Sequence, residues 1–222
     1  MRSTTSLALF ALLIAAPLAA QDKERLCNDI QHRAMRVGQW ASYRWVGGNG
    51  DGTTMRMAVV GTEPVAGTPY YWYEMSITDP KKGAKGKTII QMLVPELGFS
   101  MGSGGPRGMI MKNGADPAMR MPDEMVQMMG GRMGGQNFAA EIARRCQEMV
   151  VVGWEQVTVP AGTFRALHIK STDDKTEAWV APELYFAMVK ATMQEGSLQL
   201  TGRGADAKSS ITETPRSMPA PR

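Results

Sequence analysis

The sequence predicts an α+β protein in which one antiparallel β-sheet of about eight or nine strands packs with two or three helices. Three observations support this fold class. Short segments rich in β-branched and aromatic residues alternate between apolar and polar positions, which is typical of half-buried strands. Turns rich in glycine and proline separate these segments by a few residues, which favours antiparallel hairpins. The few stretches with helical spacing precede or interrupt runs of strands rather than alternating with them.

The first 20 residues are typical of a secretory signal peptide. Arg2 supplies a positive charge, an apolar run follows over 6–16, and small residues end at Ala20 before a charged stretch. The run is too short for a spanning helix, which needs about 20 apolar residues. We therefore expect removal of residues 1–20, a soluble periplasmic or otherwise extracytoplasmic domain over 21–205, and no stable membrane insertion.

The first half of the mature chain predicts one helix and then a β-meander. Leu26, Ile30 and Val37 fall near helical spacing, and Gly38 can end a helix over 22–36. The alternating segments that follow, joined by short turns, predict strands over 39–46, 53–59, 70–77 and 87–94.

The second half is interrupted by a segment rich in glycine and methionine over 98–135, where no strand is expected. Pro117 or Pro122 can open a short helix there, and a longer helix is expected over 138–148. Strands then resume over 149–159, 164–171, 175–180, 185–193 and 197–202. The polar, proline-rich end over 206–222 predicts a disordered tail, because it has little apolar surface to offset the entropy of ordering.

The two cysteines, Cys27 and Cys146, favour a disulfide, because an even number in an exported protein usually forms pairs. Two buried free thiols are the alternative. Two isolated cysteines do not have the paired spacing of a zinc site.

Charge and motifs weigh against several classes of function. The formal charge of +4 falls to +3 when Arg2 leaves with the signal peptide. The basic residues do not form the dense stripe that is typical of a nucleic-acid-binding protein, so we expect no nucleic-acid partner. His32 and His168 have no catalytic motif around them, and Gly102-Ser103-Gly104 lacks the spacing of a nucleophile elbow. No phosphate or dinucleotide loop occurs. We therefore expect no enzyme activity and no cofactor.

Part of the chain resembles exported bacterial proteins with the curved β-sheet of the LolA/LolB-like lipoprotein carriers. The pattern comprises 157–164 (VTVPAGTF), a strand, 177–184 (EAWVAPEL) and 188–190 (MVK), with 185–186 where a glycine is usual. Segment 38–43 resembles the opening strand. The resemblance implies a strongly curved half-barrel sheet, helices on its concave face, and an apolar groove that can hold acyl chains. It implies no catalytic residues.

Methionine is the unusual feature of the composition, because nine of 19 methionines fall between 101 and 133. Methionine is an adaptable apolar side chain that lines hydrophobic grooves. Thioether sulfur is also a soft ligand that selects Cu(I). A third interpretation is plain core filling. For copper, the helical spacing of the predicted ligands places them on one face: Met121, Met125, Met128 and Met129.

These observations favour a binding protein for an apolar ligand, either a lipid or a lipoprotein acyl chain, with 101–133 as a mobile cover. The predicted ligand-binding residues are Met109, Met111, Met121, Met125, Met128, Met129 and Trp72. A Cu(I)-binding protein and a structural envelope protein without a small ligand are the two alternatives. The expected partner is a hydrophobic ligand or a lipoprotein, and the sequence predicts no oligomeric state.

Overall fold

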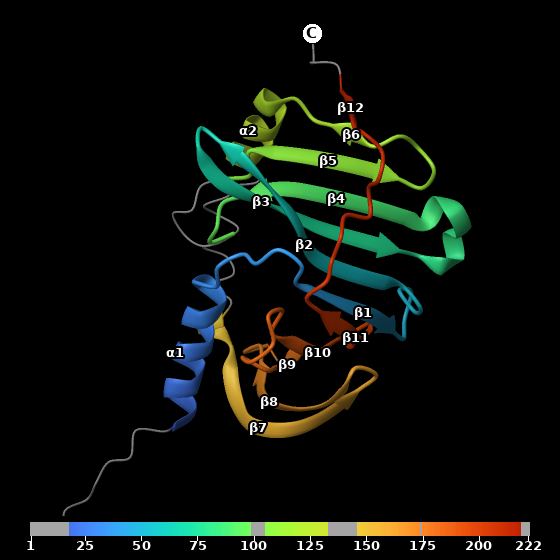
Figure 1. The fold of residues 1–222 in the computed structure, drawn as a ribbon. Coiled ribbons are helices and arrows are strands. Elements are labelled where there is room, and N and C mark those ends of the chain that lie inside the picture. Colours follow the sequence, from blue (N-terminus) through green and yellow to red (C-terminus); the bar gives the residue numbers. More distant parts are fainter. Residues whose placement is uncertain (1–17, 99–104, 133–145, 174, 219–222) are drawn as a thin grey trace, which may run out of the picture.

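A computed structural model describes residues 18–98, 105–132, 146–173 and 175–218 of the chain. Its strands form one open sheet of 12 members (Figure 1). The order across the sheet is β12-β6-β5-β4-β3-β2-β1-β11-β10-β9-β8-β7, and every neighbouring pair is antiparallel except β12 and β6. The bounds are β1 Trp40–Val46, β2 Thr54–Val65, β3 Thr68–Thr78, β4 Lys87–Val94, β5 Gly108–Asn113, β6 Met119–Arg120, β7 Val150–Val159, β8 Gly162–Lys170, β9 Glu177–Val180, β10 Met188–Met193, β11 Gly196–Gly204 and β12 Arg216–Ser217.

The expected number of eight or nine strands is too low, although each of the nine expected strands is present. The additional strands are β5, β6 and β12. Strands β5 and β6 lie in the segment rich in glycine and methionine, where local propensity gives no strand signal. Pairing with β4 supplies their backbone hydrogen bonds, so tertiary context overrides the propensity.

The described helices are α1 (Leu18–Gln31), the 3-10 helix η1 (Pro80–Gly86) and α2 (Asp123–Arg132). Helix α1 confirms most of the helix expected over 22–36, but it begins earlier and ends five residues sooner. Pro122 precedes α2, as the expected short helix requires. The helix expected over 138–148 lies mainly outside the described residues, and its last three, 146–148, are helical. Residues 1–17 of the predicted signal peptide also lie outside them.

The sheet curls strongly at the end that carries β7 to β11 (Figure 1). Tyr43 of β1 is fully buried in a core cluster with Val157 and Val159, which belong to the edge strand β7. The Tyr43 hydroxyl donates to the carbonyl of Met188 at 3.1 Å. The N–H of Ala161, in the turn after β7, donates to the carbonyl of Leu200 at 3.1 Å. The face of β1 that carries Tyr43 is therefore the inner face of the curl.

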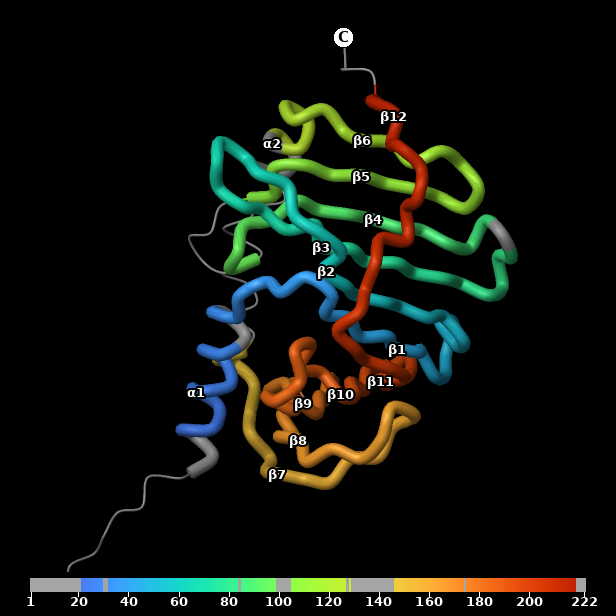
Figure 2. The backbone as a smooth tube through the Cα atoms, viewed as in Figure 1, coloured from blue at the N-terminus to red at the C-terminus, as the bar shows by residue number. Residues whose placement is uncertain are grey.

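The opposite face of β2 to β5 is covered by the C-terminal segment, residues 206–218, which crosses the strands (Figure 2). Ile211 of this segment is buried in a cluster with Trp72, Ile89, Leu93 and Ile110. The disordered tail expected over 206–222 is therefore wrong for residues 206–218. One buried isoleucine, several hydrogen bonds and the pairing of β12 with β6 offset the cost of ordering this segment.

A buried carboxylate anchors the middle of the C-terminal segment. Glu74 of β3 has no exposed surface, and its Oε2 accepts from Gln91 Nε2 at 2.8 Å and from the Ser210 N–H at 2.9 Å. Arg56 lies 3.5 Å from its Oε1. A buried charge is stable only when it is paired and hydrogen-bonded, so this contact fixes the position of the segment on the sheet.

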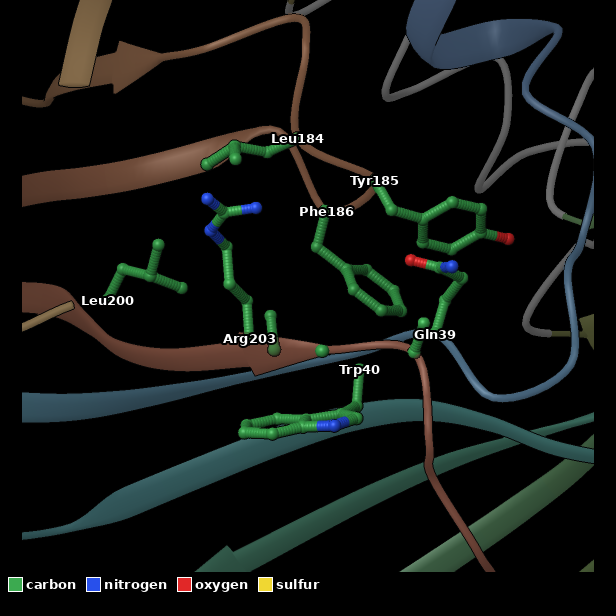
Figure 3. A pocket seen from close by; sticks show the side chains of 10 residues that line it. Gln39, Trp40, Leu184, Tyr185, Phe186, Leu200 and Arg203 are labelled. Atoms are coloured by element: carbon green, nitrogen blue, oxygen red, sulfur yellow. The ribbon is translucent and has the colours of Figure 1, made fainter. Parts of the chain in front are cut away.

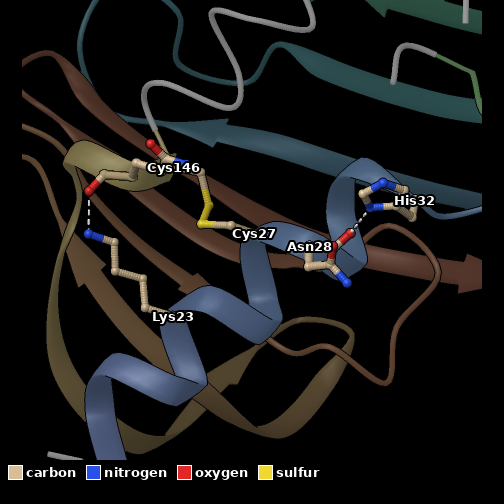
Figure 4. Close-up of a disulfide and its surroundings, with 6 residues drawn as sticks. Lys23, Cys27, Asn28, His32 and Cys146 are labelled. Atoms are coloured by element: carbon tan, nitrogen blue, oxygen red, sulfur yellow. Dashed lines mark hydrogen bonds between the residues drawn. A yellow bond between two sulfur atoms is a disulfide. The ribbon is translucent and has the colours of Figure 1, made fainter. Parts of the chain in front are cut away.

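The expected disulfide between Cys27 and Cys146 is confirmed, with a Cα–Cα distance of 5.8 Å (Figure 4). It joins α1 to the residues that lead into β7. Lys23 donates to the carbonyl of Gln147 beside it, and Trp154 Nε1 donates to Asp22 at 2.7 Å. Helix α1 is therefore attached to β7 covalently and by hydrogen bonds.

We expect replacement of both cysteines by serine to lower the free energy of unfolding by about 4–5 kcal/mol, because the bond closes a long loop in the unfolded chain. Urea denaturation measures the change. Reduction of the wild-type protein should give the same loss, whereas equal stability with and without reductant would contradict the prediction.

The packing of the C-terminal segment predicts that Ile211→Ala lowers the free energy of unfolding by about 2–4 kcal/mol, since the side chain is buried against the sheet. The exposed neighbour gives the matched control, because Thr212→Ala removes no buried apolar surface. Thermal and urea melts that leave Ile211→Ala at the wild-type midpoint would show that residues 206–218 do not pack as described.

The same segment predicts a pH-dependent contribution. A hydrogen bond from Lys112 holds the pKa of Glu213 at about 2, compared with an ordinary 4.5. Because the folded pKa is the lower one, this contact stabilises the folded protein above about pH 4.5 and is lost as the pH falls towards 2. We expect Glu213→Gln to lower the urea midpoint at pH 7, by an amount that shrinks between pH 4.5 and 2. The exposed Glu183→Gln should show no such trend.

Candidate ligand-binding face

The inner face of the sheet continues beyond the curl, across β2 to β6, as a surface of methionines. Residues that pair directly across neighbouring strands share a face of the sheet. In β2 to β6 the register pairs methionines and isoleucines with one another on this face. We call this surface the methionine face. It consists of Met55, Met57, Met75, Ile77, Ile90, Met92, Met109, Met111 and Met119.

One row of side chains follows the register across seven strands without a break. Each residue is the direct partner of the next: Arg203, Ala41, Met57, Met75, Ile90, Met111 and Met119. Neighbouring strands lie about 4.8 Å apart, so the six steps of this row cover at most about 29 Å. Apart from Arg203 at one end, every member is apolar.

The two faces of β2 to β5 differ in burial. On the face under the C-terminal segment, Ile89, Leu93 and Ile110 are at most 6% exposed. On the methionine face, every side chain of the set is half-buried rather than buried. Met55 and Met57 pack against the core cluster around Tyr43, which joins the methionine face to the interior of the curl. A contiguous, half-buried apolar surface of this kind is a candidate site for an apolar ligand.

A small pocket lies where the methionine face meets the curl (Figure 3). Its volume is about 190 Å³, and its lining includes Gln39, Leu184, Tyr185, Phe186, Leu200 and Arg203. Pockets that enclose a whole drug-sized ligand measure about 300–1,000 Å³, so this one can hold only one end of such a molecule.

The loop between β9 and β10 forms one wall of the pocket and is held by α1's continuation. Arg33 donates to the carbonyl oxygens of Pro182, Leu184 and Tyr185. The Tyr185 hydroxyl accepts from the Arg36 N–H at 3.0 Å and donates to the carbonyl of Ala34 at 3.1 Å. Residues 33–36 leave the expected helix and make these contacts, which explains why α1 ends early.

One wall of the pocket is aromatic. Phe186 packs edge-on against Tyr185 at 4.9 Å and lies 6.4 Å from Tyr73, measured between ring centroids. Burial raises the pKa of both Tyr73 and Tyr43 well above the ordinary value of 10. Tyr73 is the direct partner of Met92 on β4, so the aromatic wall of the pocket is continuous with the methionine face.

Two of the predicted ligand-binding residues lie on this face, and one lies on the other side of the sheet. Met109 and Met111 are on the methionine face, paired with Met92 and Ile90. The structure corrects the predicted ligand-binding role of Trp72. Its side chain is 9% exposed within the cluster on the opposite face, and its Nε1 donates to Glu63 at 3.2 Å. Trp72 is therefore a core residue and does not meet Met109 or Met111.

The other predicted methionines do not form one surface. Met121 is 7% exposed before α2 begins, whereas Met128 on α2 is 50% exposed and Met125 is half-buried. The side chain of Met129 lies outside the described part of the chain. The shared helix face expected for copper is thus divided between a buried and an exposed position.

The mobile cover expected over 101–133 is also wrong for the residues of β5 and β6. Met109 and Met111 are in strand β5, which pairs with β4 along its length, and the Met121 N–H donates to the carbonyl of Met109 at 2.9 Å. These methionines form the floor of the candidate site. Residues 101–104 and 133 lie outside the described residues.

Of the nine residues of the methionine face, the sequence predicted only Met109 and Met111 as ligand-binding residues. Met55, Met57, Met75 and Met92 lie in predicted strands, but no motif marks them as ligand-binding residues. The alternation within each strand contains the signal, but it appears only when the register places four strands side by side. Arg203 carried no sequence signal, because a lone arginine in a strand is ordinary.

Each of the two histidines contacts neighbouring groups of the fold. His32 Nδ1 lies 3.0 Å from the carbonyl of Asn28 at the end of α1. His168 stacks on Trp179 at 4.4 Å and lies between Glu155, at 2.7 Å, and Glu177, at 3.3 Å. Hydrogen bonds from Trp179 and His168 hold the pKa of Glu155 below its usual range. The cluster joins β7, β8 and β9 at one level of the sheet.

The described residues also bear on metal binding and on membrane crossing. They contain no group of three or more His, Cys, Asp and Glu side chains placed to hold a metal ion. Neither α1 nor α2, the α-helices of this described part, has both the length and the apolar character that a bilayer crossing requires.

No model of a protein family matches the chain, and no curated protein sequence matches it. Solved structures that resemble it include a candidate exported protein with a YmcC-like fold from Bacteroides fragilis, 12% identical with a TM-score of 0.35. A candidate lipoprotein from Parabacteroides distasonis is 10% identical with a TM-score of 0.36. Each covers 77% of this chain, which in turn covers 97% of each.

MucB is 11% identical with a TM-score of 0.45 and covers 86% of this chain, which spans 61% of the length of MucB. Likenesses of this strength assign neither a family, a ligand nor a compartment. The resemblance to LolA/LolB-like carriers stays a prediction.

Proposed function

We propose that this protein binds the acyl chain of a lipid or lipoprotein on its methionine face, in the extracytoplasmic space, and that it is a binding protein rather than an enzyme. The observation that carries the proposal is the unbroken row of apolar side chains on the inner face of the sheet, which are half-buried from Met57 to Met119. The signal peptide expected over 1–20 supports the compartment.

Methionine suits this task for a physical reason. Its side chain is unbranched and polarisable, so neighbouring methionines can adjust their rotamers to a flexible chain. Removing apolar surface from water contributes about 25 cal/mol per Å², and the half-buried side chains still have surface to lose. A slender acyl chain can cover such a surface without a deep cavity.

The length of the surface also agrees with the length of an acyl chain. One leaflet of a bilayer is about 15 Å thick in its hydrocarbon part, which is half of the usual 30 Å. With a strand separation of about 4.8 Å, one chain crosses roughly three strands. A chain that begins over β1 would therefore contact Met57 and Met75 and end near Ile90.

We expect the double variant Met57→Gln with Met75→Gln to weaken binding of a fluorescent acyl probe with an uncharged head group about tenfold. Two thioethers that contact the chain would be replaced by amides of similar size, at a cost of about 1.5 kcal/mol. A fluorescence titration measures the affinity, and urea melts confirm that the variant folds.

The matched control changes two methionines of α2, Met125→Gln with Met128→Gln, and should bind the probe as the wild type does. If this control lost binding and the methionine-face variant kept it, α2 would be the site. Titration of the wild type and of both variants with Cu(I) under reducing conditions measures copper affinity, and a loss of that affinity in Met125→Gln with Met128→Gln would favour the alternative of a Cu(I)-binding protein.

Mass spectrometry of protein purified gently from its native compartment provides the second test. We expect co-purified molecules with acyl chains. Finding none, together with no binding of the uncharged probe, would contradict the proposed function and leave the structural alternative.

A further inference from the structure

Arg203 is the charged residue that lines the pocket. Arg56 lies beside Glu74, Arg120 beside Glu63 and Lys112 beside Glu213. Among the residues that the structure describes, Arg203 has no ion pair. Its guanidinium lies 5.5 Å from the ring centroid of Phe164, a contact that leaves its hydrogen-bond donors available.

The pocket presents this cation to one end of the methionine face. Figure 3 shows the Arg203 side chain extending into the pocket between Leu200 and Phe186. No carboxylate is among the side chains that line the pocket. Arg33 donates to the backbone carbonyls of Leu184 and Tyr185 and is not among the residues that line the pocket, so Arg203 is the arginine available to a ligand there.

The register connects the cation to the apolar surface. Arg203 is the direct partner of Ala41, Ala41 of Met57, and Met57 of Met75. A charged group in the pocket and a chain along this row would form one straight path across the strands. The volume of about 190 Å³ suits a head group with the first part of a chain, and the remainder must lie on the open face.

Building on the proposed function, we propose that the ligand is a fatty acid whose carboxylate binds the guanidinium of Arg203 and whose chain lies over Ala41, Met57 and Met75. A planar guanidinium matches a carboxylate with two parallel hydrogen bonds. A single available arginine balances one negative charge, whereas a phosphate monoester carries up to two at neutral pH. The geometry thus favours a carboxylate.

The test compares three probes of one chain length: a fatty acid, its methyl ester and the corresponding alkyl phosphate. We expect the wild type to bind the acid about fivefold more tightly than the ester, because a solvent-reached ion pair contributes up to about 1 kcal/mol. In Arg203→Gln this preference should disappear while the ester binds as before. The exposed, distant Arg216→Gln removes the same charge and should keep the preference.

The outcomes separate this inference from the proposed function. If neither acid nor ester binds, the proposed function fails and this inference fails with it. If both bind equally in the wild type, or if Arg203→Gln keeps the preference, the methionine face stands and the role of Arg203 is refuted. Tighter binding of the alkyl phosphate than of the acid would overturn the choice of a carboxylate.

Discussion

The curling of the sheet around Tyr43 is the constraint on which the other features depend. The strands from β1 to β7 bring Val157 and Val159 back onto the face of β1, so Tyr43 is enclosed and its hydroxyl is satisfied by a backbone carbonyl. Only this end of the sheet closes. Strands β2 to β6 continue the same inner face past the closed part, where the described residues supply no second layer of strands.

The two faces of strands β2 to β6 differ in how they are covered. The outer face is covered by the C-terminal segment, in which Ile211 is buried and the Ser210 N–H donates to one oxygen of the Glu74 carboxylate. The inner face keeps a half-buried layer of thioethers that ends at Arg203 and its pocket. A stable core and an accessible apolar surface thus share the same strands, because successive residues of a strand point to opposite faces.

Much of the fold could be predicted because its signals are local. Alternation and turns identified nine strands, and the pair Cys27 and Cys146 was correctly expected to bond. The candidate site was predicted less well. The density of methionine over 101–133 predicted one site for residues that the fold separates, such as the buried Met121 and the exposed Met128. Trp72 lies under the C-terminal segment. The alternation of apolar and polar residues within its strand does not indicate that this segment covers it.

The sequence by itself determined which residues alternate along each strand, where the turns fall, and which cysteines were available to pair. These properties depend on neighbours within a few residues. The tertiary structure decided which of the two faces is the inside of the curl, that β5 and β6 join the sheet, and that Arg203 stands in line with Met57 and Met75. Register and curvature arise from contacts between strands far apart in the chain, so no local pattern contains them.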